Sequence, residues 1–448
     1  MPQLLAFSGV RPNTSVTGPL DEVVCPPYDI ISERERLELL GRSPYNIVRL
    51  ELPNGRYDDA ARLLHQWEST GALTREQRPA LYAYRMSYIS AEGDPRQTLG
   101  VIGALVLEPP GHGILPHEET TPKAKSDRLE LIRATEANTS PIWCLCSEGG
   151  LTDALGNPPY NASASASANA NANAGDGDGD GGDASGLVAS AQDDEGTLHE
   201  IWPVFAPAVQ QEVAKIIQAR PLLVADGHHR YETALTYQAE RNQGAPRPAS
   251  QPTGTSPATF TGTSIGASTG TSDGGVGGYD AVLALVVELS EQHLQVMAIH
   301  RVVSGLPAGY GLLGGLEPSF DLSPTTSEGP ALLAEMLNVG ALAVLTGTGN
   351  WLAKARPGGP VAAYELDSSR IDAALRALPA HELSYEHDPG QAQAAVRSGE
   401  ADAAILCRPA TVRQIAQTAH GGVRMPPKTT FFWPKPRTGM VLRDFGSA

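Results

Sequence analysis

The sequence contains little that could cross-link the chain. It has four cysteines in 448 residues, too few for a disulfide scaffold. Cys144 and Cys146 are separated by one residue, which is not the spacing of a zinc knuckle. We therefore expect all four cysteines to be small buried core residues.

Positive charge and long apolar runs are also scarce. The 33 Lys and Arg residues are outnumbered by 50 Asp and Glu, and the formal net charge of -17 gives a surface that repels nucleic acid and anionic lipid. No stretch approaches the roughly 18 apolar residues of a membrane-spanning helix, and residues 1–9 have no basic, cleavable leader pattern. These absences predict a cytoplasmic protein that binds neither nucleic acid nor membranes. They do not predict an oligomeric state.

Two stretches, residues 157–198 and 242–278, have a composition that cannot build a core. The first is rich in Ala, Ser and Asn before its Gly-Asp repeats, and the second is rich in Gly, Thr, Ser and Pro, so we expect two disordered inserts. The first contains seven acidic residues and no Lys or Arg, so the net charge without it would be -10 instead of -17. Its repeats lack the bidentate Glu of a calcium loop.

The inserts leave three ordered parts, residues 1–156, 199–241 and 279–448, of which the middle one is too short to fold alone. We therefore expect an α+β fold in which all three parts share one core, built on a mixed β-sheet with flanking helices. The residue patterns predict helices beginning at Ser32 and covering residues 57–69, 369–378 and 411–419, strands over residues 80–89, 99–107 and 341–346, and a hairpin of residues 281–289 with 295–299.

Polar groups are densest between a buried strand predicted at residues 221–225 and a helix predicted at residues 231–240. Between them lie Asp226, Gly227, His228, His229 and Arg230. The N–H groups and dipole of a helix start favour an anion, and an Arg side chain can grip phosphate with two parallel hydrogen bonds. We therefore predict a phosphate site in which Asp226 holds Mg²⁺. An ordinary polar helix cap remains an alternative, and so does zinc bound by Asp226, His228 and His229 with His117 or Glu118.

A second polar concentration covers residues 115–128, which we expect to form a long substrate loop. In this loop, Glu118 could act as general base for a hydroxyl, while Lys123 and Arg128 could clamp a transferring phosphoryl group. A solvated charged loop without function is the alternative. Asp29, which follows a rigid Pro-Pro-Tyr turn, is the second candidate for the base, or else a helix cap.

A third concentration covers residues 425–436, where prolines favour an extended path. Lys428 and Thr429 could contact an anionic ligand there, whereas the aromatic residues favour core packing over stacking on a base. His300 and Arg301 follow a predicted strand and could either bind an anion or form a salt-bridged strand end.

Six ordered blocks of the sequence resemble the family catalogued as domain of unknown function 1015. The blocks are Pro26-Pro27-Tyr28-Asp29, residues 45–50, Pro116-His117-Glu118, residues 225–234, His300-Arg301 and residues 425–435. The resemblance covers nearly the whole chain outside the two inserts. The family name supplies no activity.

Residues Asp226–Arg230 also resemble the phosphate-binding motif of the ParB/sulfiredoxin superfamily, which includes nucleotide-dependent free serine kinases, CTP-binding partition proteins and sulfiredoxins. Sulfiredoxins have their catalytic cysteine where this chain has His228, and partition proteins add a basic DNA-binding region, so the serine-kinase-like branch fits best. This resemblance implies a ParB/sulfiredoxin-like core. It also implies Mg²⁺ at Asp226 and nucleotide phosphates at His228, His229 and Arg230.

We therefore predict a nucleotide-dependent, kinase-like phosphotransferase for a small hydroxylated metabolite such as serine, with ATP or another nucleotide and Mg²⁺ as cofactors. A Walker-type phosphate loop and the protein-kinase signatures are missing from the sequence. A metal-dependent phosphoester hydrolase is one alternative. A nucleotide-binding regulatory protein without turnover is another.

Overall fold

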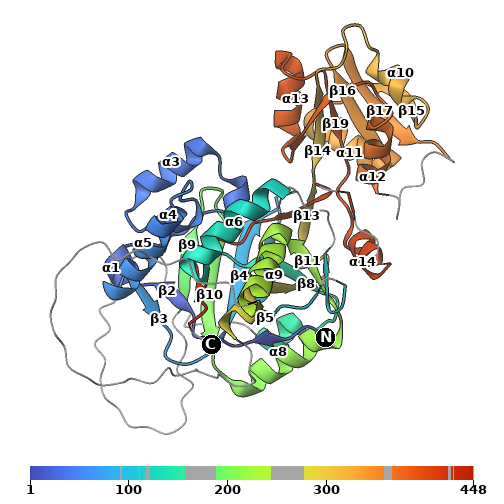
Figure 1. The fold of residues 1–448 in the computed structure, drawn as a ribbon. Coiled ribbons are helices and arrows are strands. Elements are labelled where there is room, and N and C mark those ends of the chain that lie inside the picture. The colour runs from blue at the N-terminus through green and yellow to red at the C-terminus, as the bar shows by residue number, and fades with distance from the viewer. Residues whose placement is uncertain are drawn as a thin grey trace, which may run out of the picture.

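A computed structural model describes residues 1–90, 93–109, 111–116, 122–156, 188–243, 277–357, 366–421, 425–426 and 428–446. Most of the strands belong to two sheets, one of nine strands and one of six (Figure 1). Within the described ranges, no helix is long and apolar enough to cross a bilayer.

The nine-stranded sheet has the order β6-β11-β8-β12-β5-β4-β10-β9, with β1 paired to β5. The strands are β1 (Leu4–Leu5), β4 (Leu81–Ile89), β5 (Pro95–Val106), β6 (Ile114–Pro116), β8 (Ile142–Cys146), β9 (Ala189–Gln192), β10 (Leu198–Val204), β11 (Leu222–Asp226) and β12 (Ala281–Glu288). The pairs β6–β11 and β8–β12 are parallel and the others antiparallel. The mixed sheet and the α+β class are therefore confirmed. Strands from before, between and after the two low-complexity stretches lie side by side in this sheet.

Both faces of the nine-stranded sheet are covered, and the central strand β12 shows why. Successive side chains of a strand point to opposite faces, so Val282, Ala284 and Val286 join one buried cluster while Leu283 and Leu285 join another. Helices α7 (Leu151–Leu155), α8 (Pro207–Ala219) and α9 (His228–Asn242) contribute to the first cluster. Helices α2 (Leu20–Val23) and α14 (Val412–His420) and strand β20 (Thr430–Trp433) contribute to the second.

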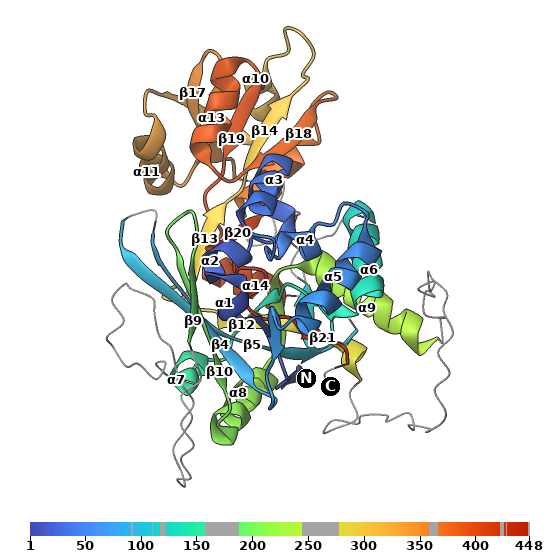
Figure 2. The same ribbon diagram turned by 90° about the vertical axis from the view of Figure 1, so that its left-hand side faces the viewer.

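The N-terminal segment forms a helical layer next to this sheet (Figure 2). It consists of α1 (Thr14–Thr17), the 3-10 turn Tyr28–Ile30, α3 (Glu33–Arg42), α4 (Val48–Glu51) and α5 (Tyr57–Ser69), with α6 (Pro122–Thr135) packed on α5. The short ribbons are β2 (Val10–Pro12) with β3 (Leu73–Arg75), and β7 (Ala137–Asn138) with β21 (Arg443–Asp444). Ser32 Oγ accepts a hydrogen bond of 3.2 Å from Glu35 N–H, as its capping pattern predicts.

The six-stranded sheet is set apart from the rest, and β13 (Gln295–Ala298) paired with β20 leads to it (Figure 1). Its order is β15-β17-β16-β19-β14-β18, with every pair antiparallel. The strands are β14 (His300–Ser304), β15 (Phe320–Thr325), β16 (Leu342–Thr346), β17 (Gly349–Ala355), β18 (Glu382–Glu386) and β19 (Ala403–Leu406). Helices α10 (Leu312–Leu316) and α12 (Asp367–Leu375) pack on one face, and α11 (Gly329–Val339) and α13 (Pro389–Ser398) on the other.

Three expectations from the sequence need correction. The hairpin of residues 281–289 with 295–299 is wrong, because β12 pairs with β5 and β8 while β13 pairs with β20. A fully apolar strand buried on both faces takes a central place in the sheet, and its neighbours there come from distant segments. The long loop expected at residues 115–128 is wrong where β6 and α6 form. The six-stranded sheet has buried clusters of its own, which the prediction of one shared core does not include.

The first insert was predicted to extend too far toward the C-terminus. Residues 189–192 form β9 and pair with β10, and three of the seven acids counted as linker belong to the fold. Asp193 contacts His199 at 3.0 Å and Arg437 at 3.0 Å, Asp194 pairs with Arg42, and Glu195 accepts a hydrogen bond from Trp433. All four cysteines are free and buried, as expected.

Candidate functional site

The predicted phosphate motif lies where β11 ends and α9 begins. Asp226 is the last residue of β11, Gly227 caps the helix with φ of 85°, and the helix starts at His228, three residues earlier than predicted. A Cβ at Gly227 would lie 3.0 Å from the Ile142 side chain and 3.1 Å from that of Arg230, so glycine suits this position sterically as well as by its φ. The first hydrogen bond of the helix joins Tyr231 N–H to Gly227 O at 3.0 Å. The N–H groups before it lie at the positive end of the helix dipole.

Asp226 holds two cations in place at this helix start. Its Oδ1 accepts a hydrogen bond of 2.6 Å from Lys435 Nζ, and its Oδ2 accepts one of 2.9 Å from Arg230 Nη2. Burial by itself would raise the pKa of the Asp226 carboxyl, but the charges of Lys435 and Arg230 outweigh this effect and hold that pKa well below its usual value. The carboxylate is therefore ionised at neutral pH and fixes both cations.

Arg230 is nine-tenths buried, with a side-chain exposure of 10%. Its Nη1 donates a hydrogen bond of 2.5 Å to the Pro141 carbonyl, but its buried Nε has no hydrogen-bond partner among the described residues. The aromatic ring of Tyr28 lies 5.9 Å from this guanidinium and 4.2 Å from that of Arg128. Burial raises the pKa of Tyr28 to about 12, so its phenol stays protonated at neutral pH. Asp29 is near enough for its charge to raise the pKa of Arg230.

A cavity of about 40 Å³ adjoins Arg230, between α6 and α9. Its polar lining includes Glu51, Arg128, Ser140 and Thr233. The Glu51 carboxylate is only 1% exposed and accepts hydrogen bonds from Ser140 Oγ at 3.0 Å, from Thr139 Oγ1 and, more weakly, from Arg128 Nη1 at 3.5 Å. The site therefore combines the ion-paired cations of the helix start with a small polar hollow beside them.

The residues predicted in the 115–128 segment have different outcomes. Glu118 and His117 lie outside the described residues, and so does the side chain of Lys123. Arg128 is on α6 instead of a loop, is buried, and donates to Asp127 and to the Glu51 carbonyl. The structure nevertheless brings Arg128 to the same cavity as Arg230.

The residues predicted in the 425–436 segment do not gather at the motif. Thr429 Oγ1 donates to the Pro426 carbonyl at 2.7 Å and lies 3.0 Å from Ser368 Oγ, beside a separate cavity of about 200 Å³. The Lys428 carbonyl accepts a hydrogen bond of 2.9 Å from Arg301. Arg301 is fully buried and pairs with Asp372, which supports the salt-bridged strand end and not the anion contact.

The two metal predictions find no further ligands in the described structure. Within the residues that can be placed, no group of three His, Cys, Asp or Glu side chains could hold a metal ion. Both oxygens of Asp226 are paired with cations, Oδ2 with Arg230 and Oδ1 with Lys435. The zinc alternative also needs His117 or Glu118, which lie outside the described residues, so zinc and Mg²⁺ at Asp226 both stay predictions.

Four residues of the site, Lys435, Glu51, Ser140 and Thr233, were not predicted from the sequence. Lys435 stands in the Pro-Lys-Pro of the third polar segment and Glu51 directly follows the block at residues 45–50, so both lay in or beside noted blocks without being chosen. For Ser140 and Thr233, nothing in the sequence beyond their polar side chains indicates a place in the site. Lys435 and Asp226 are 209 positions apart, and only the fold reveals that contact.

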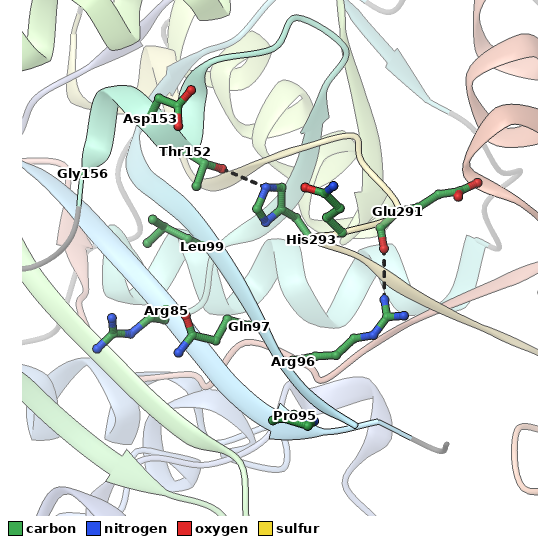
Figure 3. Close-up of a pocket in the computed structure, with 11 residues that line it drawn as sticks. Arg85, Pro95, Arg96, Gln97, Leu99, Thr152, Asp153, Gly156, Glu291 and His293 are labelled. Carbon is green, nitrogen blue, oxygen red and sulfur yellow. Dashed lines mark hydrogen bonds between the residues drawn. The ribbon is translucent and has the colours of Figure 1, made fainter. Parts of the chain in front are cut away.

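A larger cavity of about 770 Å³ lies elsewhere, along β4 and β5 and next to α7 (Figure 3). Arg96 donates a hydrogen bond of 3.0 Å to the Glu291 carbonyl there, and Thr152 lies 3.5 Å from the His293 ring. None of the predicted site residues lines this cavity. Size alone therefore does not select the candidate site.

Comparisons with known proteins complete the description. A family model described as "Protein of unknown function (DUF1015)" matches residues 4–175 and 183–373. None of the curated proteins matches this chain. A conserved hypothetical protein from Pyrococcus furiosus is similar in structure, with 13% identity and a TM-score of 0.32 over 72% of this chain and 88% of that one.

Two further solved structures are similar to the same degree. A free serine kinase in complex with AMP has 12% identity and a TM-score of 0.34 over 73% of this chain and 89% of that one. SbnI with a C-terminal truncation, from Staphylococcus aureus, has 11% identity and a TM-score of 0.35 over 76% of this chain and 87% of that one. These identities and TM-scores are too low to transfer a site or an activity.

Proposed function

The chain belongs to the DUF1015 family, and from the chemistry of its site we propose that it is a nucleotide-dependent phosphotransferase for a small hydroxylated metabolite. The observation that carries this proposal is the pair of cations, Arg230 and Lys435, that Asp226 fixes at the N-terminal end of α9. The motif resemblance to nucleotide-dependent serine kinases supports the same assignment.

The arrangement suits phosphoryl transfer for a physical reason. A phosphoryl group in transit spreads negative charge over its oxygens, and catalysis of its transfer consists mainly of positioning and charge stabilisation. Cations already held by Asp226 need little reorganisation when that charge develops. The positive end of the 15-residue helix α9 adds to their effect.

We assign the residues as follows. Lys435 and the first turn of α9, with His228 and His229, bind the nucleotide phosphates, and Arg230 stabilises the transferring group. Mg²⁺ is placed on the nucleotide phosphates, because this ion usually keeps few protein ligands and takes substrate oxygens instead. Glu118 stays the proposed base for the acceptor hydroxyl, and Asp29 is the second choice, supported by its electrostatic effect on Arg230.

The decisive test is nucleotide binding by variants with and without the Lys435 charge. We expect ATP or ADP with Mg²⁺ to bind the wild type in calorimetric titrations, and Lys435→Met to weaken that binding about tenfold to a hundredfold, as for the loss of a charged hydrogen bond. Lys215→Met on α8 is the matched control, since Lys215 has a side-chain exposure of 78%. Equal nucleotide affinity in Lys435→Met and wild type would refute the proposal.

The alternative functions differ in their products. Phosphate released from the nucleotide without any acceptor would identify a hydrolase. Tight nucleotide binding with no product over hours, across varied acceptors, would identify a regulatory protein. A phosphorylated acceptor identifies the phosphotransferase.

A further inference from the structure

We propose that the cavity beside Arg230 is a subsite for the carboxylate of a small hydroxy acid or hydroxylated amino acid. The inference rests on the proposed function, because it names the acceptor class for the same site. The subsite consists of Arg230 and Thr233 on α9, Arg128 on α6, and Glu51 and Ser140 opposite them.

The first observation is a pair of buried hydrogen-bonding groups with nothing to bond. Arg230 Nε and Thr233 Oγ1 both lack a hydrogen-bond partner among the described residues, and Thr233 is only 3% exposed. An unsatisfied buried polar group costs about 1–3 kcal/mol, so an unpartnered atom on each of two lining residues calls for an occupant. The two residues are three positions apart on one helix, which places them on the same face. A guanidinium and a hydroxyl on one helix face can together bind the two oxygens of a carboxylate.

The second observation is the size of the cavity. About 40 Å³ accommodates one or a few groups of the size of a water molecule, because a hollow of about 10–15 Å³ is enough to hold one. That space is too small to enclose a nucleotide base or a triphosphate. The cavity therefore takes the polar end of a small ligand, while the nucleotide phosphates lie at the start of the helix.

The third observation is the charge of the lining. Arg128 and Arg230 are cationic, and the only carboxylate among the described lining residues is Glu51. The Glu51 carboxylate already forms an ion pair with Arg128 and accepts hydrogen bonds from Ser140 and Thr139. It therefore repels an incoming anion less than an unpaired carboxylate would. A buried cation with an unused donor then favours an anionic oxygen in the cavity.

The geometry also links this subsite to the transfer site. The Arg230 guanidinium donates to Asp226 through Nη2, and Arg230 also lines the cavity. A ligand anchored by its carboxylate is therefore in contact with the same side chain that stabilises the phosphoryl group. This arrangement gives proximity between the acceptor and the nucleotide.

The test compares two threonines of the same helix. Thr233→Val removes the unpartnered hydroxyl, whereas Thr236→Val removes an exposed hydroxyl that donates to the Glu232 carbonyl at 2.9 Å. The probes are L-serine, D-glycerate, L-alanine and ethanolamine, with binding measured by calorimetry. L-alanine lacks the acceptor hydroxyl and ethanolamine lacks the carboxylate.

We expect the wild type and Thr236→Val to bind L-serine or D-glycerate, Thr233→Val to bind it at least tenfold more weakly, and ethanolamine not to bind. Thr233→Ser keeps the hydroxyl and should keep the affinity of the wild type. This variant separates loss of the hydroxyl from a folding defect. Unchanged affinity in Thr233→Val would overturn the inference. Failure of every carboxylate probe to bind the wild type would overturn it as well, leaving ordered water as the occupant.

Titrating ADP with the same variants separates this inference from the proposed function. If ADP binds but no carboxylate binds in a Thr233-dependent way, the phosphotransferase proposal stands and the subsite proposal is refuted. If L-serine or D-glycerate binds in a Thr233-dependent way but no nucleotide binds, the subsite proposal stands and the phosphotransferase proposal is refuted.

Discussion

The two sheets of this protein bury charged side chains in different ways. In the six-stranded sheet, the buried Arg301 pairs with Asp372, and Arg408 pairs with Asp367. Among the described residues from 300 to 407, no buried side-chain nitrogen or oxygen lacks a hydrogen-bond partner. Beside the nine-stranded sheet, Arg230 and Thr233 keep unpartnered atoms. Paired charge of the first kind stabilises the fold, and the unused donors beside the Asp226–Arg230 pair are the observation from which the subsite is proposed.

The difference follows from how the two sheets are assembled. The six-stranded sheet is antiparallel throughout and formed by one continuous region, so its ion pairs join elements of that region. The nine-stranded sheet collects strands from three separate regions, and the segment around Lys435 reaches it from near the C-terminus. Where such segments come together, charged side chains from different parts of the chain can surround a cavity, as they do beside Arg230.

The largest expected effect tests the structural role of charge in the six-stranded sheet. Arg301→Met leaves Asp372 without its partner and two carbonyls without a donor, so we expect the free energy of unfolding to fall by about 3–5 kcal/mol. Urea denaturation measures this loss. Arg356→Met is the control. Its ion pair with Asp321 is exposed, so its loss should lower the free energy of unfolding by less than about 1 kcal/mol. Loss of ADP binding in folded Arg301→Met would contradict the separation of the two regions.

The next effect concerns pH and the same sheet. His300 is 3% exposed, its Nδ1 accepts a hydrogen bond from Cys407 N–H, and burial lowers its pKa to about 4. Since the unfolded chain binds this proton near pH 6.5, stability falls as the pH drops from about 6.5 to 4, by roughly 3 kcal/mol. His300→Asn should remove most of that fall in denaturation curves. His65→Asn, at an exposed position, should leave it unchanged.

A smaller effect sharpens the role of Asp226. Asp226→Asn weakens the hydrogen bonds to Lys435 and Arg230, so we expect a loss of about 1.5–3 kcal/mol of stability at pH 7. Because the pKa of Asp226 is depressed in the folded protein, its contribution is present above roughly pH 4 and is lost as the pH falls through the depressed value. The difference between the variant and wild type should therefore shrink in acid. A difference that stays constant down to low pH would contradict the ion-pair assignment.

The smallest effect concerns the predicted inserts. Residues 161–186 lie outside the described ranges, and their composition cannot build a core. Deleting them should change the melting temperature by less than about 2 °C, the scale of a fraction of a kcal/mol in a large domain. Asp193→Asn, in the same predicted insert but paired with His199 and Arg437, should lower it by more. If the deletion and Asp193→Asn changed the melting temperature equally, the claim that residues 161–186 lie outside the fold while Asp193 belongs to it would be wrong.

Local patterns in the sequence were enough to predict much of this architecture. The cap at Ser32 and the helix Tyr57–Ser69 appear as expected, and the strand predicted at residues 221–225 appears one residue later, as Leu222–Asp226, because periodicity and capping depend on neighbouring residues. The hairpin of residues 281–289 with 295–299 was wrong, because strand pairing depends on which distant strands compete for the same edge.

The candidate site divides in the same manner. Local sequence was enough to predict that Asp226, Gly227 and Arg230 stand at the start of a helix behind a buried strand. The ion pair of Lys435 with Asp226, and the cavity lined by Glu51, Arg128 and Thr233, became visible only in the folded chain. The physical reason is that a residue's own neighbourhood in the chain dictates its local conformation, whereas contacts across hundreds of residues depend on packing of the whole core.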